Sequence, residues 1–320
     1  MVKLNHVLRA EQFLDTNCQE AIFQEALRLK KISSTENGAL SLRKELEGKN
    51  ITLFFGEPSS RTRGSFETAG KKLGANTVLI EGAFYGKIEN PLTIALIAAE
   101  LLTDVLVMRH PKAGLVEEVA QILDEFAPNI SVINAGDNAR EHPTQMLLDV
   151  LTIREVKQKT LKQGKLTVGL VGDLKDSRVF HSDAIGLSPW GVRFVLISPG
   201  GENLPDYVLE ILERNKNPLK KTNDIREFAS EIDVWIFTRF QRERKGEGDL
   251  SEQRKAYIDA FSLTPELRKL IKRRAIVLHP LPRLEEMPYS FDSDPRALYF
   301  SRQIKNGIYV RMAILEMLCS

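Results

Sequence analysis

Short apolar runs alternate with segments of helical character along most of this chain. The runs are rich in β-branched and aromatic residues, as buried strands are; they are Ile51–Phe55, Thr77–Glu81, Val105–Met108, Ser131–Asn134, Leu166–Leu174, Phe194–Ile197, Val234–Phe237 and Ala275–Leu278. Strands separated by helices pair in parallel, with the helices on the faces of the sheet. The alternation therefore predicts an α/β fold built on parallel sheets.

The length of 320 residues predicts two domains. We place them at residues 1–150 and 151–305, each a parallel β-sheet flanked by helices, with a Rossmann-like second domain. Long interdomain helices link the two. One runs from Met146 to about Lys159, and the C-terminal helix at residues 306–320 packs back on the first domain. The polar, Lys-rich stretch 158–165 is interpreted as a hinge.

Composition argues against several classes of partner. The formal net charge is +2 with no basic block, so neither nucleic acid nor an anionic membrane is expected to bind. The longest apolar run, Pro91–Leu102, is interrupted by Glu100 and is too short to span a bilayer. Cys18 and Cys319 are expected to be free thiols, and no signal peptide is recognised. These features predict a soluble, cytoplasmic protein.

A group of hydroxyls and guanidiniums lies where the first strand passes into a helix. Gly56 and Pro58 end the strand, Ser59–Arg63 follows, and a helix is expected over Ser65–Leu73, ended by Gly74. At a helix start, unpaired backbone N–H groups and the positive end of the helix dipole attract anions. Arginine adds donors that fit phosphate oxygens. The stretch therefore predicts an anion site, most plausibly for phosphate.

Two short motifs in the sequence also allow other interpretations. Ser59 or Ser60 could be an ordinary helix cap, with Arg61 and Arg63 on a solvated face. Gly169 and Gly172 follow a strand, as in dinucleotide-binding folds, but the three-glycine fingerprint and the acidic residue after the next strand are lacking. We therefore expect no nucleotide there.

Five sequence strings occur together, in a fixed order. They are Phe55–Glu67, Val107–Pro111, His142–Gln145, Thr238–Arg244 and His279–Arg283. In this order they resemble the motifs of the aspartate/ornithine carbamoyltransferase family, which usually has S-T-R-T-R where this chain has S-S-R-T-R. The last two strings resemble the forms found in the aspartate-specific members, because the ornithine-specific members carry a cysteine in the last motif. The resemblance covers nearly the whole chain.

The resemblance implies a reaction and a set of ligands for its first substrate. Carbamoyl phosphate and L-aspartate would give N-carbamoyl-L-aspartate and phosphate, the committed step of pyrimidine synthesis, with no metal or other cofactor. The implied catalytic residues are Arg61, Thr62, Arg109, His142 and Lys87. The implied carbamoyl phosphate ligands are Ser59, Ser60, Arg61, Thr62, Arg109, His142, Gln145, Pro280 and Leu281.

For L-aspartate, the resemblance implies Arg178 and Arg239 as carboxylate ligands and Gln241 as a further polar contact. Two guanidiniums suit a dicarboxylate, since each can pair bidentately with one carboxylate. His181 and His279 are expected to be satisfied buried imidazoles. Arg283, Glu243 and Arg244 are interpreted as members of domain-closure salt bridges.

One loop departs from the family pattern. The family carries a serine and a catalytic lysine that reach a neighbouring subunit's site, and an ungapped comparison puts Phe84 and Ile88 at those positions. Lys87 lies one residue away, and a shift of one residue in the loop at residues 84–91 would restore it. The Asp-Thr pair that usually follows is replaced by Ile94-Ala95.

Three hypotheses about function follow. The first is an active aspartate carbamoyltransferase, a homotrimer with active sites shared between subunits. The second is a non-catalytic paralogue that acts as a structural or sensing partner, and the third is a carbamoyltransferase for a different amine. Regulatory or pathway-enzyme chains are further partners that the resemblance allows.

Overall fold

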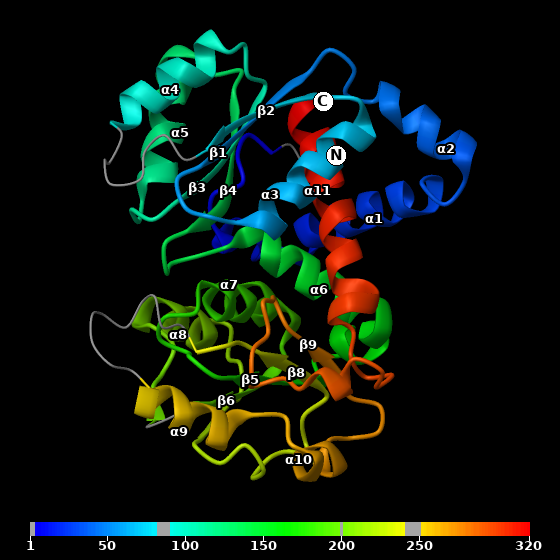
Figure 1. Cartoon of the computed structure of the whole chain (residues 1–320), viewed down its shortest axis with the longest axis vertical. Coiled ribbons are helices and arrows are strands. Elements are labelled where there is room, and N and C mark those ends of the chain that lie inside the picture. Colours follow the sequence, from blue (N-terminus) through cyan, green and yellow to red (C-terminus); the bar gives the residue numbers. More distant parts are fainter. Residues whose placement is uncertain (1–3, 82–89, 199–200, 241–250) are drawn as a thin grey trace. The chain divides into compact units, whose positions relative to one another are not determined.

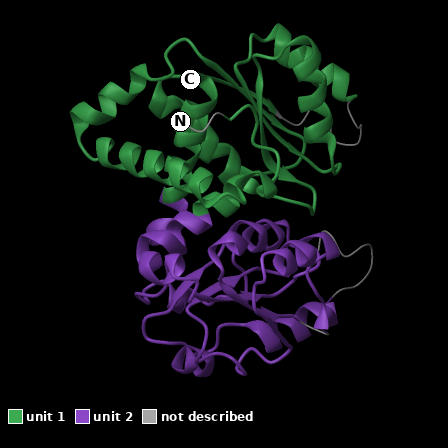
Figure 2. Cartoon of the chain, turned by 180° about the vertical axis from the view of Figure 1, so that it is seen from behind, with its two compact units in different colours: residues 1–148, 306–320 green, residues 149–305 purple. Residues whose placement is uncertain are grey.

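The computed structural model describes residues 4–81, 90–198, 201–240 and 251–320. They form two compact units, residues 1–148 with 306–320 and residues 149–305 (Figure 2). Among the residues described, no helix is long and apolar enough to cross a membrane. Cys18 and Cys319 are both free thiols, as predicted.

Unit 1 has a four-stranded parallel sheet in the order β2-β1-β3-β4. Helices α4 and α5 pack on one face of it, and α3 lies on the other with α1 and α11 (Figure 1). The strands are β1 Asn50–Phe55, β2 Asn76–Glu81, β3 Val105–His110 and β4 Ser131–Asp137. The helices are α1 Thr16–Ile32, α2 Glu36–Ser41, α3 Ser60–Leu73, α4 Pro91–Glu100, α5 Leu115–Phe126 and α11 Ile304–Cys319, with short 3₁₀ turns at Ala10–Phe13 and Leu42–Lys44.

Unit 2 has a five-stranded parallel sheet in the order β7-β6-β5-β8-β9. Its strands are β5 Thr167–Val171, β6 Arg193–Ile197, β7 Leu219–Thr222, β8 Val234–Phe237 and β9 Ile276–Leu278. Its helices are α7 Arg178–Leu187, α8 Asp206–Arg214, α9 Ser251–Phe261 and α10 Pro265–Leu270, with short helical turns at Ser188–Trp190, Tyr289–Phe291 and Tyr299–Gln303. Helices α7 and α8 lie on one face and α9 and α10 on the other (Figure 1). The predicted α/β class with parallel sheets is confirmed.

Helix α6, Pro143–Lys162, begins in unit 1 and ends in unit 2. The predicted hinge at residues 158–165 is wrong as far as Lys162, because the helix continues through that residue. Lysine and glutamine are good helix formers, and Leu161 is fully buried on the helix. The helical backbone is interrupted at Lys157, one residue before the predicted hinge begins.

Helix α3 begins at Ser60, five residues before the predicted start at Ser65. Thr62, Phe66, Ala69 and Leu73 are buried on one face of it. Their helical spacing extends the apolar stripe backward to Thr62 and explains the earlier start. Gly74 ends the helix with φ +88°, a conformation that favours glycine. The helix therefore begins directly at the predicted anion site.

Candidate functional site

Three strand ends of unit 1 carry the residues predicted to bind carbamoyl phosphate. Ser59–Thr62 follow β1, Arg109 is the penultimate residue of β3, and His142–Gln145 follow β4 at the start of α6. The carboxyl ends of parallel strands share one edge of a sheet, which is where ligands bind in open α/β sheets. The fold of unit 1 therefore brings these three segments to one edge.

At the start of α3, Ser59 occupies the capping position, but its side chain makes no capping hydrogen bond. The interpretation of Ser59 as an ordinary cap is therefore wrong, since its hydroxyl does not serve the helix. Ser60 and Arg61 are exposed, whereas Thr62 is buried. The first backbone N–H groups of a helix lack partners within the helix, so donors from backbone and side chains are concentrated here.

Thr62 and His142 belong to the starts of different helices and meet in unit 1. Thr62 Oγ1 lies 3.5 Å from His142 Nε2, and both residues are buried. The His142 carbonyl accepts the Gln145 backbone N–H at 2.9 Å, which forms the first turn of α6. These contacts bring the hydroxyl, the imidazole and the Gln145 amide to one region of unit 1.

Arg109 pairs with a carboxylate that the sequence interpretation did not single out. Arg109 Nη2 lies 2.6 Å from Glu57 Oε1, and the Arg109 side chain is 14% exposed. The Gly56 N–H donates to the Arg109 carbonyl at 2.8 Å, which ties the two segments together. A Cβ on Gly56 would lie 2.6 Å from His110 Cδ2, so only glycine fits this approach. Glu57 thus orients the Arg109 guanidinium. The position of Glu57 inside the first of the five strings was the one sequence feature that could have indicated this role.

Arg311 of α11 was also missed, and it joins two helices that carry predicted ligands. Its Nη1 donates to Ser65 Oγ of α3 at 2.8 Å, and its Nη2 donates to Thr144 Oγ1 of α6 at 3.5 Å. The guanidinium also lies over the Phe66 ring, 4.9 Å from the centroid. Its side chain therefore fixes the starts of α3 and α6 relative to each other.

Glu141 precedes His142 and is 4% exposed. Its carboxylate accepts the Ala10 backbone N–H at 2.5 Å. Burial raises the pKa of Glu141 to about 7, and the more distant Arg9 and Arg140 offset only part of this effect. A buried group that titrates near neutral pH therefore adjoins a predicted catalytic residue.

Unit 2 carries the residues predicted to bind L-aspartate. Arg178 is the first residue of α7 and is 6% exposed, after Ser177, whose hydroxyl accepts the Phe180 N–H. Arg239 follows β8, where Tyr257 donates a 2.6 Å hydrogen bond to the Thr238 carbonyl. The Arg239 Nη1 group donates to the Phe240 carbonyl at 3.2 Å. Both arginines follow strands of the same parallel sheet.

The segment after β9 contains Pro280 and Leu281. The His279 ring lies between them and Glu286, accepting from the Leu281 N–H at 2.8 Å and contacting Glu286 Oε1 at 3.0 Å. His181 Nε2 contacts the Leu174 carbonyl at 3.0 Å. The prediction that both histidines are satisfied and buried is confirmed.

The residues predicted to form domain-closure salt bridges, and two predicted ligands, remain to be placed. Arg283 pairs with Asp292 and stacks near Tyr289, Tyr299 and Phe300, all within unit 2. These contacts hold Arg283 inside unit 2, and its role in domain closure stays a prediction. Lys87, Gln241, Glu243 and Arg244 lie outside the described residues.

Sequence comparison identifies the family. Residues 5–155 match the carbamoyl-P binding domain of aspartate/ornithine carbamoyltransferases, and residues 164–318 match the Asp/Orn binding domain of the same proteins. The chain belongs to the aspartate/ornithine carbamoyltransferase family. The resemblance inferred from the five strings is thereby confirmed.

Individual carbamoyltransferases are similar over most of their length. The aspartate carbamoyltransferase catalytic subunit of Clostridium acetobutylicum is 40% identical over 277 residues, covering 85% of this chain and 86% of that protein. The Methanothrix thermoacetophila catalytic subunit is 37% identical over 99% of both chains. The Trypanosoma cruzi aspartate transcarbamoylase crystallised with N-(phosphonacetyl)-L-aspartic acid has a TM-score of 0.86 and 32% identity, covering 98% of this chain and 96% of that one.

Proposed function

We propose that this carbamoyltransferase family member transfers the carbamoyl group from carbamoyl phosphate to L-aspartate. The observation that carries the proposal is the convergence of Ser59–Thr62, Arg109 and His142–Gln145 at one sheet edge of unit 1. The similar catalytic subunits of C. acetobutylicum and M. thermoacetophila, which bear the name aspartate carbamoyltransferase, support the choice of amine. The products are N-carbamoyl-L-aspartate and phosphate.

In this reaction the aspartate amine attacks the carbonyl carbon. A C–N bond forms, the bond from the carbonyl carbon to the phosphate oxygen breaks, and the amine loses one proton. Negative charge develops first on the carbonyl oxygen and then on the departing phosphate, so donors that are already in place supply most of the catalysis.

We assign the phosphate to the start of α3, where Ser59, Ser60, Arg61 and Thr62 supply donors. Arg109 reaches both phosphate and the carbonyl oxygen, while Glu57 keeps its guanidinium in one orientation at 2.6 Å. His142 and Thr62 donate to the carbonyl oxygen, and their 3.5 Å contact supports a shared target.

The remaining ligands follow from the chemistry of each substrate. The side-chain carbonyl of Gln145 and the backbone carbonyls of Pro280 and Leu281 accept hydrogen bonds from the carbamoyl NH₂ group. Arg178 and Arg239 pair with the two carboxylates of L-aspartate. Lys87 supplies a further charge at the departing phosphate, and Gln241 a polar contact to aspartate.

Oligomeric state and compartment belong to the same proposal. We propose a homotrimer with shared active sites, which is supported by exposed apolar residues of unit 1: Val78 and Leu79 of β2, and Leu92 and Leu96 of α4. Leu92 and Leu96 lie four residues apart on one side of their helix, and exposed apolar patches mark interfaces between chains. Light scattering of the purified protein measures the mass, and a monomer would contradict the trimer. We also propose a cytoplasmic location.

A steady-state assay of carbamoyl aspartate formation tests the function. We expect turnover that requires both substrates and falls about a hundredfold in Lys87→Ala, because a cation at the departing phosphate is lost. Lys112→Ala is the matched control, since Lys112 is exposed in the loop after β3. Turnover that survives Lys87→Ala would remove Lys87 from the site. Absence of turnover, with carbamoyl phosphate still bound by calorimetry, would favour the non-catalytic paralogue.

A further inference from the structure

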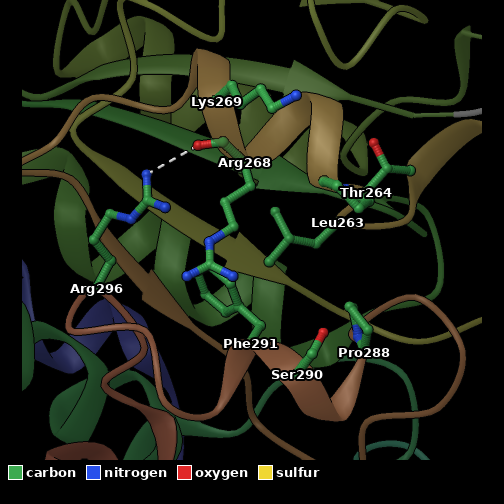
Figure 3. A pocket seen from close by; sticks show the side chains of 9 residues that line it. Leu263, Thr264, Arg268, Lys269, Pro288, Ser290, Phe291 and Arg296 are labelled. Carbon is green, nitrogen blue, oxygen red and sulfur yellow. Dashed lines mark hydrogen bonds between the residues drawn. The ribbon is translucent and has the colours of Figure 1, made fainter.

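Unit 2 contains a cavity of about 420 Å³ beside α10. It is lined by residues from α10 and from the segment around Tyr289–Phe291 and Arg296 (Figure 3). This volume lies in the range of small-molecule sites. None of the lining residues belongs to the predicted ligands of carbamoyl phosphate or aspartate.

A buried carboxylate fixes two guanidiniums at this cavity. Asp294, whose side chain is 3% exposed, accepts from Arg296 Nε at 2.9 Å and from Arg296 Nη2 at 2.8 Å, and it pairs with Arg268 Nε at 2.8 Å. The remaining Arg296 nitrogen, Nη1, donates to the carbonyls of Arg268 and Ile271. The nitrogens of Arg296 are therefore used within the protein.

Arg268 differs from Arg296 because only its Nε is engaged. No residue in the described parts of the chain accepts a hydrogen bond from its two terminal nitrogens. Its guanidinium projects into the middle of the cavity beside Phe291, 5.5 Å from the ring centroid (Figure 3). Asp294 thus fixes the orientation of the Arg268 guanidinium, and its two terminal nitrogens can donate hydrogen bonds to a ligand.

Other lining groups add to this donor set. Lys269 Nζ and the Ser290 hydroxyl also have no hydrogen-bond partner among the described residues, and Ser290 points its hydroxyl toward the cavity (Figure 3). The lining contains three cations, Arg268, Lys269 and Arg296. The carboxylate that pairs with the two arginines, Asp294, is not part of the lining. Glu266, which lies on α10 outside the lining, interacts with Lys269 and offsets part of this excess positive charge. The cavity therefore keeps a net positive charge.

The rest of the lining is apolar. Leu263, Pro265, Pro288 and Phe291 contribute carbon surface on both sides of the Arg268 guanidinium. Small-molecule sites combine such surface with a few fixed polar groups that set the orientation of the ligand. We propose that this cavity binds a small organic anion, with its carboxylate, sulfonate or phosphate group on Arg268 and an apolar body against Phe291 and Leu263.

Titration of the full chain with anilinonaphthalene sulfonate tests this site, because that probe combines a sulfonate with aromatic rings. Saturating N-(phosphonacetyl)-L-aspartate is present throughout to occupy the proposed catalytic site. We expect one binding event per chain. Competition with benzoate and with phenyl phosphate then shows whether the site prefers a carboxylate or a phosphate group. Comparison of phenyl phosphate with inorganic phosphate shows whether the ligand needs an apolar body.

Two variants alter the cavity in different ways. Arg268→Ala removes the charged donors, and we expect binding at least about tenfold weaker because a charge-assisted hydrogen bond is lost. Ser290→Trp fills the cavity from an exposed position and leaves Asp294, Arg268 and Arg296 in place, with the same expected loss. Arg226→Ala is the matched control, since Arg226 pairs with Asp224 on the surface, away from the cavity.

Each outcome decides the proposal. Loss of binding in Arg268→Ala and Ser290→Trp, with Arg226→Ala unchanged and all three proteins folded by circular dichroism, supports the site. Binding that is unchanged in Ser290→Trp overturns it, even if Arg268→Ala fails to fold. Equal weakening in Arg226→Ala overturns it as well, because the probe would then respond to surface charge alone.

Discussion

The two units hold buried carboxyl groups in opposite ways. Glu141 in unit 1 is buried against a backbone N–H, with its cations further away, and its pKa rises to about 7. Asp294 in unit 2 is equally buried but contacts two guanidiniums, and its pKa falls to about 2. Burial alone disfavours the charged form, whereas cations in contact favour it.

The candidate substrate residues show a related contrast. Unit 1 places one guanidinium, Arg109, against a carboxylate of its own, Glu57. The corresponding arginines of unit 2 are Arg178 and Arg239, for which we propose the substrate's carboxylates as partners. Unit 1 is therefore expected to control the chemical step and unit 2 the affinity for the amine. The changes below test that division.

Replacing Arg109 should have the largest effect. Arg109→Ala removes a donor from the developing charge, so we expect kcat to fall about a hundredfold or more, with little change in the KM for aspartate. Steady-state kinetics measure both constants. Lys112→Ala, which removes an exposed cation from the loop after β3, should leave them unchanged. A rise in the KM for aspartate with normal kcat would show that Arg109 binds the amine substrate and does not act in the chemical step.

Replacing Glu141 should change how stability depends on pH. The folded pKa of about 7 lies above the ordinary value of 4.5, so the folded state keeps a proton that the unfolded state releases. Stability therefore falls as pH rises from about 5 to 8, by up to about 3 kcal/mol.

Glu141→Gln should abolish this fall and make the protein more stable than the wild type at pH 8. Urea unfolding at pH 5 and pH 8 measures the difference. Glu125→Gln, at an exposed position of α5, should behave as the wild type. Equal pH dependence in Glu141→Gln and the wild type would show that the carboxylate is ionised in the folded state.

Replacing Arg178 should affect the amine substrate. Arg178→Ala removes a bidentate partner of one carboxylate, so the KM for aspartate should rise about ten- to a hundredfold. The KM for carbamoyl phosphate should stay the same in the same assay. Lys175→Ala, an exposed cation of the preceding loop, is the control. Equal increases in both constants would argue against separate roles for the two units.

Replacing Asp294 should have the smallest effect. Its lowered pKa stabilises the fold above about pH 4, and this contribution is lost as pH falls toward 2. Asp294→Asn should cost about 2 kcal/mol at neutral pH. Denaturant unfolding at neutral and acidic pH should show that the two proteins converge at low pH. A constant difference would mean that packing, and not charge, is lost.

The fold and much of the candidate site could be predicted from local signals. The strands β3, β4, β6 and β8 are apolar runs that the sequence predicts close to their observed bounds. Strand β7 was missed because Leu219–Thr222 is largely polar, as an edge strand allows. The positions of Ser59–Arg63, Arg109 and His142 at strand ends were also predictable, since parallel strands share one carboxyl edge.

The sequence by itself determined the class of fold, the order of its elements and the residue types offered to an anion. Only the tertiary structure decided which groups meet. Glu57 and Arg109 are 52 residues apart, and Ser65 and Arg311 are 246 apart. The Asp294 network and the cavity beside α10 likewise depend on packing between separate segments. Periodicity and propensity report on neighbours along the chain, whereas contacts, burial and pKa depend on neighbours in space.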